Sequence, residues 1–220
     1  MNATDHALAI LKAGLNAVPI VGGSIASLIG DYIPSSTQRA LQAAVEELKE
    51  RLAKLENRID AESVDREQFA ELFKSSYLIL VRTHDPRRRH AVVALITNAL
   101  LRDGDSEKLP FTELDHFVRC LEILSTGALD VVKQAVSMAR ERRSSHLDKR
   151  SFRFSFGDLE TRFSDTDEHL LLGLVGELNA VNLIHQLAIP TVRHEANLYG
   201  NYPLELTPLG ARFVERLVEG

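Results

Sequence analysis

The sequence predicts a mainly α-helical protein, in which a multi-helix antiparallel bundle is followed by a small α+β domain. Apolar side chains recur three and four residues apart through most of residues 1–148, which is the spacing of one helix face. At residues 152–156 the spacing changes to two, with phenylalanine at alternate positions, as is typical of a short strand. A chain of 220 residues that is 45% hydrophobic is large enough to form two cores. We therefore expect domains at residues 1–148 and 151–220.

The first predicted element is an apolar hairpin at residues 13–34, where Pro19 and two adjacent glycines interrupt a nearly continuous apolar run. A transmembrane helix needs ~20 predominantly apolar residues, and these breaks, together with Asn16 and Asp31, argue against one. Three roles remain open for this surface: protein core, oligomer interface or membrane-directed hairpin. The side chains expected to contact a membrane or partner are Val18, Ile20, Val21, Ile25, Leu28, Ile29 and Ile33.

A long helix is predicted after Pro34, with Ser35 and Gln38 spaced as a capping box at its start. Its apolar positions advance by alternating steps of four and three, which is the heptad pattern of a coiled-coil seam. These positions are Leu41, Val45, Leu48, Leu52, Leu55 and Ile59. Glu47 and Arg51 are spaced to pair on the solvated face. Because only about three heptads are present, we expect the seam to pack inside the bundle, with a dimer through it as the alternative.

Capping residues mark the starts of three further helices. Asp65 precedes one apolar helical stretch, and Asp85 followed by Pro86 opens the next, with proline at the first helical position. Thr112 opens another helix, which a Thr-Gly step at 126–127 interrupts before the apolar pattern continues. Short turns between such helices favour antiparallel neighbours.

Two groups of basic residues lie at the ends of predicted helices. We predict that Arg87, Arg88 and Arg89 in the first group contact an anion, such as a lipid head group, nucleic acid or an acidic partner. Arg142 and Arg143 in the second group are predicted to do the same. Arginines near a helix C-terminus also stabilise the helix dipole without any ligand, and this is the alternative for the second group.

The end of the chain carries an ordered series of elements. A helix over about residues 167–182 is followed by an Asn-Leu-Ile step, a hairpin with arms at about 189–194 and 202–207, and a closing helix opened by Thr207 and Pro208. Over residues 158–220 this order resembles the C-terminal half of winged-helix domains. The resemblance depends on Leu183, Ile184, Leu206, Thr207 and Gly210. It departs from the family pattern at Asn182, where glycine is common.

The charge of this winged-helix-like module argues against DNA binding. Residues 151–220 carry 5 Lys and Arg against 10 Asp and Glu, whereas residues 1–150 carry 21 of each, so the net charge of −5 belongs to this module. The expected recognition helix contains Asp167, Glu168 and Glu177 but no Lys or Arg. Because winged helices neutralise DNA phosphates with such basic residues, we expect the module to contact protein instead.

No group of residues predicts catalysis, a metal or a cofactor. His116 and Cys120 are one helical turn apart, but Cys120 is expected to pack beside an apolar stripe rather than react. The loop with Asp103, Asp105 and Glu107 lacks the order of a calcium site, and we expect a solvated turn. A single cysteine and the lack of a cleavable leader pattern indicate a cytoplasmic protein, peripheral to the inner membrane if the hairpin contacts lipid.

The pattern at the start of the chain comprises Pro19, Gly22, Gly23, Ile33, Pro34 and Arg39. This opening is similar to that of an unclassified group of bacterial helical-bundle proteins, some of which belong to anti-phage or stress loci. The resemblance implies a bacterial defence or stress effector. We therefore expect a non-enzymatic, self-associating protein whose hairpin contacts a membrane or partner and whose acidic module docks a protein or serves as a regulatory element. The alternatives are a dimeric DNA-binding transcriptional regulator and a soluble scaffold or adaptor.

Overall fold

The computed structural model describes residues 35–60, 64–144, 152–187, 200 and 202–219, with the side chains of 35–38 and 142–144 outside the description. The predicted apolar hairpin at 13–34 lies outside the described residues. The chain divides into two compact units, which we describe separately. The first unit extends to Glu122 and includes residues 216–218, and the second contains Ile123–Glu215 and Glu219. The described residues are mainly helical, as the sequence predicts, with one small antiparallel sheet.

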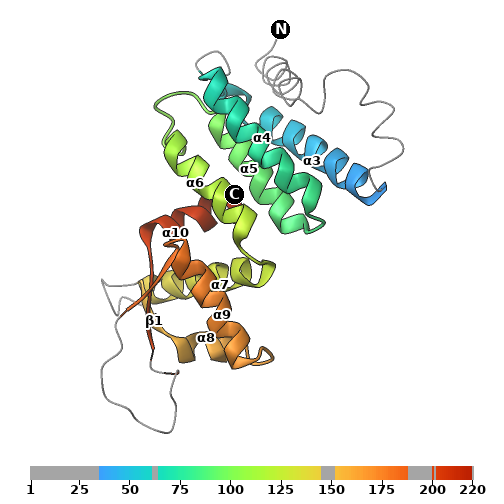
Figure 1. Ribbon diagram of the computed structural model, residues 1–220. Helices are drawn as coiled ribbons and strands as arrows, with labels where there is room; N and C mark the ends of the chain where they lie inside the picture. Colours follow the sequence, from blue (N-terminus) through green and yellow to red (C-terminus); the bar gives the residue numbers. More distant parts are fainter. Residues whose placement is uncertain (1–34, 61–63, 145–151, 188–199, 201, 220) are drawn as a thin grey trace. The chain divides into compact units, whose positions relative to one another are not determined.

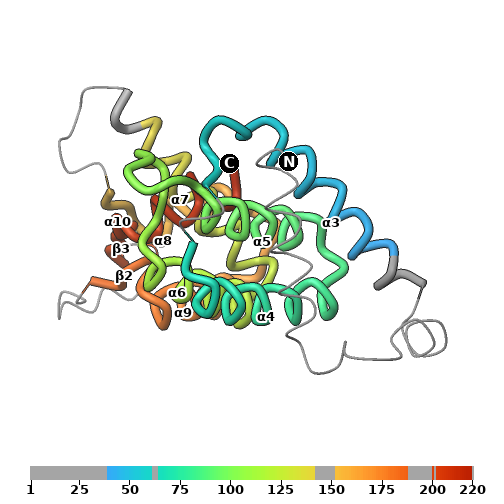
Figure 2. Tube along the Cα trace, turned by 90° about the horizontal axis from the view of Figure 1, so that it is seen from above, coloured from blue at the N-terminus to red at the C-terminus, as the bar shows by residue number. Residues whose placement is uncertain are grey.

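The first unit is built from helices. They are α3 (Ser35–Lys54), the short 3-10 helix η1 (Glu56–Arg58), α4 (Arg66–Arg82), α5 (Pro86–Ala99) and α6 (Phe111–Ile123). Helices α3, α4 and α5 contact one another pairwise and lie side by side in Figure 1 and Figure 2. The isolated bridge between Ile59 and Leu101 joins the residues that follow η1 to those that follow α5.

Helix α5 is the most enclosed element of the first unit. Every residue from Ala91 to Leu101 is buried, including the polar Thr97 and Asn98. A helix that is apolar all round needs neighbours on every side, because each exposed face would leave apolar surface in water. The Thr97 hydroxyl donates to the Val93 carbonyl at 2.8 Å, and the Asn98 amide binds the backbone of the following loop. Thr97 and Asn98, the two polar side chains in the buried part of α5, are therefore both hydrogen-bonded.

The predicted heptad seam of α3 packs inside the first unit. Leu48 and Leu52 are buried, and Leu52 is fully excluded from solvent, so a coiled-coil dimer cannot use the whole seam. One seam position was wrongly predicted, because Val45 is 45% exposed. Ala44 takes its place in the buried row, since residues spaced by four (44, 48 and 52) follow one side of a straight helix.

The predicted helix starts are largely correct. Asp65 caps α4, its carboxylate accepting hydrogen bonds from the backbone N–H of the second and third helical residues. Asp85 caps α5 by accepting from the Arg87 backbone N–H, with Pro86 at the first helical position. Helix α6 begins at Phe111, one residue before the predicted Thr112. Such caps satisfy backbone donors that have no partner within the helix, which makes them recognisable from local sequence.

The second unit combines helices with a three-stranded antiparallel sheet. Its elements are α7 (Thr126–Ser144), β1 (Arg153–Ser155), α8 (Phe156–Arg162), α9 (Glu168–Ala180), β2 (Ile184–Gln186), β3 (Pro203–Leu206), α10 (Pro208–Phe213) and the π-helical turn η2 (Val214–Val218), whose last residues belong to the first unit. Strand β3 lies between β1 and β2, with Leu204 opposite Phe154 and Leu206 opposite Ile184. All four of these side chains are buried, so one face of the sheet lines the core.

The boundary between the two units lies before α7, whereas the sequence predicted a domain boundary between residues 148 and 151. Helix α7 packs against α8, α9, β1, β3 and α10, and it belongs to the second unit. Ser125 precedes α7, and its backbone N–H donates to the Glu177 carboxylate of α9 at 2.6 Å. The second unit therefore starts at the α6–α7 break, because the apolar residues of α7 cover the sheet and its helices.

Two further details of the second unit differ from expectation. The first strand of the hairpin is β2 at Ile184–Gln186, which begins at the last residue of the Asn-Leu-Ile step, whereas the predicted arm at 189–194 lies outside the described residues. Phe152, Phe154 and Phe156 do not share one strand, because Phe156 begins α8. Ser155 and Asp158 form a capping box there, and this local hydrogen bonding ends the strand.

The α9–β2 turn and the start of α10 are joined by a small hydrogen-bond network. Thr207 caps α10 by accepting from the Gly210 N–H at 2.9 Å, and its hydroxyl lies 2.8 Å from the Asn182 carbonyl. Asn182 has a φ of 58°, a left-handed conformation that asparagine tolerates better than most residues, which explains why it can stand where glycine is common. At Gly210 a Cβ atom would lie 2.2 Å from the Leu183 carbonyl oxygen. Glycine is therefore required at this contact.

We expect Gly210→Ala to reduce the free energy of unfolding by about 1–3 kcal/mol, because its Cβ would force apart the backbone of two elements. The matched variant is Gly173→Ala in α9, where a Cβ would meet no atom within 4 Å. That variant should gain up to about 1 kcal/mol, since alanine is the better helix former. Chemical denaturation of the full chain, at a protein concentration low enough for it to be monomeric, measures both changes. Equal effects of the two substitutions would contradict the close approach at Gly210.

Candidate functional site

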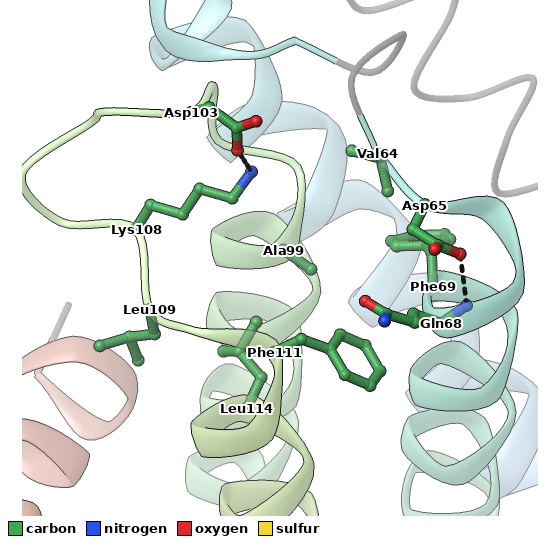
Figure 3. Close-up of a pocket in the computed structure, with 10 residues that line it drawn as sticks. All are labelled: Val64, Asp65, Gln68, Phe69, Ala99, Asp103, Lys108, Leu109, Phe111 and Leu114. Atoms are coloured by element: carbon green, nitrogen blue, oxygen red, sulfur yellow. Dashed lines mark hydrogen bonds and ion pairs between the residues drawn. The ribbon is translucent and has the colours of Figure 1, made fainter.

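A pocket of about 200 Å³ lies in the first unit, where the start of α4 faces the end of α5 and the start of α6. Figure 3 shows side chains from these helices, and from the loop before α6, around a common space. The apolar part of the lining comes from Val64, Phe69, Ala99, Leu109, Phe111 and Leu114. Asp65, Gln68, Asp103 and Lys108 supply the polar part. This lining suits a small, mainly apolar group with a polar end.

Local hydrogen bonds fix most of the polar groups around this pocket. The Asn98 side chain donates to the Glu107 carbonyl and accepts from the Leu109 N–H, both at 2.8 Å, and so holds the loop against the end of α5. Lys108 pairs with Asp103 at 2.8 Å across the rim, as Figure 3 shows. The Asp65 carboxylate caps α4. The polar rim is therefore engaged in structural contacts, which leaves shape and apolar surface as the features that a ligand would meet.

The loop after α5 was predicted to be a solvated turn, and for Asp105 this is wrong. The Asp105 side chain is 6% exposed and accepts two hydrogen bonds from the Arg58 guanidinium, at 2.8 and 2.7 Å. Arg58 also donates to Glu107 at 2.7 Å. These hydrogen bonds from Arg58 hold the pKa of the Asp105 carboxyl well below its ordinary value and lower that of Glu107 as well. These hydrogen bonds tie the loop after α5 to Arg58, which follows α3 and lies 47 positions before Asp105.

A second group of charged side chains forms where α3 meets the first turn of α5. Glu47 and Arg51 come from α3, and Arg89 and His90 come from α5; we call these four residues the Glu47 cluster. His90 Nδ1 lies 2.6 Å from Glu47 Oε1, and Arg51 Nη2 lies 2.7 Å from His90 Nε2. The Nε atoms of Arg51 and Arg89 lie 3.8 and 3.7 Å from the Glu47 carboxylate. Two guanidinium groups and an imidazole therefore surround one carboxylate.

The arginines of α5 that were predicted to contact an anion do not gather at one place, and they have different neighbours. Arg87 is half-exposed and pairs with Asp85, the cap of its own helix, at 3.2 Å. Arg89 turns instead toward α3 and joins the Glu47 cluster, while Arg88 is half-buried. Arg142 and Arg143 belong to the last turn of α7, and their side chains lie outside the described residues. Of the predicted membrane or partner contacts, all of which fall at 18–33, none lies within the described residues.

The candidate nucleophile Cys120 is part of the core of the first unit. Its side chain is excluded from solvent, and burial raises the pKa of the Cys120 thiol to about 12. His116 Nε2 lies 3.5 Å from the Cys120 sulfur, one turn away on α6. A thiol with this pKa stays protonated at neutral pH, so the pair lacks the thiolate that nucleophilic catalysis needs. Within the described residues, no three His, Cys, Asp or Glu side chains are placed to hold a metal ion.

Helix α9 has an exposed side. From the sequence, only the charged residues of this helix were considered. Leu171, Leu174, Val175 and Leu178 point into the core of the second unit. The opposite side carries His169, Leu170, Gly173, Gly176, Asn179 and Ala180, all exposed, with Leu170 57% exposed. We call this side the α9 face. It is mostly apolar and small, with His169 and Asn179 as its exposed polar residues and with acidic residues at the start of the helix.

Comparison of the chain with protein-family models, with curated proteins and with solved structures gave no match. Among the helices that the structure describes, none has the length and apolar character needed to cross a membrane. Function must therefore be inferred from the residues themselves.

We expect Asp105→Asn to reduce the free energy of unfolding by about 1–3 kcal/mol at pH 7, because it removes an ionised acceptor from a partly buried arginine. Since the folded-state pKa of Asp105 is depressed, its contribution is complete above its ordinary pKa and is lost as pH falls through the folded-state value. The wild-type protein should therefore lose stability more steeply than the variant between roughly pH 5 and pH 2. Denaturation at a series of pH values measures both slopes.

Asp115→Asn is the matched control for this experiment, because the Asp115–Arg119 pair is exposed on α6. We expect it to change stability by less than about 1 kcal/mol and to keep the wild-type dependence on pH. A pH slope of Asp105→Asn that equals the wild-type slope would show that the Arg58–Asp105 pair does not stabilise the fold.

A thiol reagent should label Cys120 of the native protein at least about a hundredfold more slowly than that of protein unfolded in guanidinium chloride. The reason is that the sulfur is buried and its pKa is raised to about 12. Spectrophotometric titration of the thiol at neutral pH gives both rates. Rapid labelling without loss of helical circular dichroism would mean that Cys120 is accessible, and would restore it as a candidate nucleophile.

Proposed function

We propose that this protein is a non-enzymatic, self-associating interaction protein, in which a helical bundle is joined to a winged-helix domain that binds protein rather than DNA. The winged-helix assignment is supported by the order of α8, α9, β2, β3 and a closing helix capped by Thr207. Helix α8 precedes α9 in the chain. In a winged-helix domain this order would make α9 the second helix of the helix-turn-helix, which is the recognition helix of DNA-binding members. The function then depends on what the exposed side of α9 can bind.

The observation that carries this proposal is the α9 face itself. A recognition helix that enters the major groove needs arginine, lysine or amide side chains directed at phosphates and base edges. The α9 face offers an exposed leucine, two glycines and an alanine, with His169 and Asn179 as exposed polar groups and the half-buried Glu177 two turns after Leu170, but no Lys or Arg. Asp167 and Glu168 at its start would repel the phosphate backbone. Protein is the partner that such a surface suits.

The two glycines of the α9 face add a second reason. A Cβ atom at Gly173 or Gly176 would meet no atom within 4 Å, so packing within the second unit does not require glycine at either position. Glycine inside a helix costs about 1 kcal/mol relative to alanine, and nothing within the unit offsets this cost. Glycines on a helix surface allow the backbone of another element to approach closely. An occupant packed directly on α9 would give both residues a role.

We propose a second copy of the chain as this occupant, packed through an antiparallel pair of α9 helices around a two-fold axis. In that arrangement Leu170 of one chain would meet Ala180 of the other, and the glycines would meet near the axis. The acidic start of each helix would lie beside the C-terminal end of its partner, away from the other acidic start. The two helix dipoles would also oppose each other, which is the favourable orientation.

The remaining parts of the predicted function are compatible with this assignment. Contact of the apolar hairpin at 18–33 with a membrane or partner stays a prediction, because that segment lies outside the described residues. A DNA-binding regulator would share the same fold but would need its basic residues away from α9. A scaffold or adaptor would share the self-association and differ only in what the oligomer holds.

Sedimentation equilibrium of the full chain tests the proposal. We expect the wild-type protein to form dimers at micromolar concentration and Leu170→Glu to weaken the dimer by at least about tenfold, because a carboxylate would be buried against apolar surface. Ile123→Glu is the matched control, since Ile123 is 62% exposed but lies outside α9. It should leave the association constant within about twofold of the wild-type value.

Fluorescence anisotropy with a mixed-sequence DNA duplex at low salt forms the second arm of this test. No salt-dependent binding is expected from either protein. A wild-type monomer over the whole concentration range, or equal dimerisation of Leu170→Glu, would contradict the role of the α9 face. DNA binding that Leu170→Glu abolishes would assign this face to DNA and overturn the choice of a protein partner.

A further inference from the structure

Two side chains that line the pocket of the first unit make no specific contact within the described part of the chain. The side-chain amide of Gln68 has no hydrogen bond there, since only the backbone N–H of this residue is engaged, with Asp65. The half-buried ring of Phe111 contacts no other described ring. Figure 3 shows the Gln68 amide and the Phe111 ring pointing toward one another from α4 and α6. The pocket therefore offers a ligand one polar group and one aromatic surface.

The walls of this pocket are held in place by the fold. The Asn98 side chain, at the end of α5, binds the backbone of Glu107 and Leu109 and so fixes the loop that forms one wall. The buried part of the lining is apolar and consists of Phe69, Ala99, Leu109 and Leu114. A ligand would meet a pocket that is already formed, so little ordering of the chain would oppose its binding.

The volume of the pocket limits the size of the ligand. An apolar cavity of about 150 Å³ holds one benzene molecule. The pocket of the first unit, at about 200 Å³, therefore has room for one ring with a substituent or for two fused rings. Phe69 and Phe111 both belong to the lining, and aromatic rings pack favourably on one another in offset or edge-to-face geometry. A small aromatic compound fits both the volume and the lining.

The charged groups of the lining are each engaged, which favours an uncharged ligand. The Asp65 carboxylate binds backbone N–H groups at the start of α4, and Asp103 pairs with Lys108 at 2.8 Å. A charged ligand would lose its hydration without gaining a counter-ion, and an anion would also meet two carboxylates against one ammonium group. The Gln68 amide can instead donate or accept a neutral hydrogen bond.

We propose that this pocket binds a small uncharged aromatic compound, with one ring or two fused rings, whose polar group forms a hydrogen bond with the Gln68 amide. The ring of the ligand would pack against Phe111 and cover the buried apolar lining, which removes apolar surface from water. The site lies wholly in the first unit. Its binding activity is therefore separate from the self-association proposed for the α9 face of the second unit.

Equilibrium dialysis of the full chain tests the proposal, with phenol as the one-ring probe and indole as the fused-ring probe. Because the chain contains no tryptophan, fluorescence excited beyond the tyrosine band reports indole alone. We expect at least one of the two probes to bind at one site per chain. Indole-3-acetate should bind at least about tenfold more weakly than indole, because its carboxylate would lose hydration beside the acidic side chains of the lining.

Two substitutions in the lining locate the bound probe. Gln68→Ala removes the hydrogen-bonding partner and should weaken binding about three- to tenfold. Phe111→Ala removes the aromatic wall and should weaken binding at least about fivefold. The matched controls are Glu71→Ala, at an exposed position of α4, and Val45→Ala, at an exposed apolar position of α3, because neither residue lines the pocket. Both controls should stay within about twofold of the wild-type affinity.

Circular dichroism first establishes that each variant is folded. Gln68 is exposed, so Gln68→Ala provides the test if Phe111→Ala unfolds. Failure of both phenol and indole to bind would overturn the proposal, as would wild-type affinity in Gln68→Ala. Binding of indole-3-acetate as tightly as indole would contradict the preference for an uncharged ligand. Equal losses in the lining variants and in the controls would place the bound probe outside this pocket.

Discussion

The complete burial of α5 is the constraint on which the first unit depends. Because Ala91–Leu101 is enclosed throughout, the helices that pack on it, α3 and α4, must direct their apolar faces toward it. On α5, side chains reach solvent only in its first residues, 86–90. Its first turn presents Arg89 and His90 to α3, and its last turn holds the loop of the pocket through Asn98. The two ends of one helix thus position both the charged cluster and the apolar pocket.

Features encoded by neighbouring residues could be predicted from the sequence. The caps at Asp65, Asp85 and Thr207 involve side chains that bind backbone groups two or three positions away, and each was recognisable. The membership of α7 was not, because an apolar stripe shows that a helix is buried without showing which core receives it. Strand β1 pairs with β3 about 50 positions later, and three residues are too few to reveal that pairing by their spacing alone.

In the candidate sites, too, features that depend on neighbouring residues could be predicted, and contacts between distant segments could not. A run of arginines was visible at 87–89, but only the fold directs Arg89 toward Glu47 and Arg87 toward its own cap. Asp105 looked like a solvated residue in an acidic loop, since its partner Arg58 lies 47 positions away. The pocket depends on three helices and a loop, and its lining residues have no common sequence pattern. Contacts between distant segments therefore determine which charged side chains pair, and composition alone does not show these pairs.

Net charge along the sequence and local charge in the fold are different quantities in this protein. The acidic excess of the chain lies beyond residue 150, and around α9 it would repel any polyanion. The first unit carries 16 Lys and Arg against 18 Asp and Glu, yet helix packing brings two arginines and a histidine to one carboxylate. The acidic residues beside α9 therefore favour protein over a polyanion as the partner proposed for the α9 face.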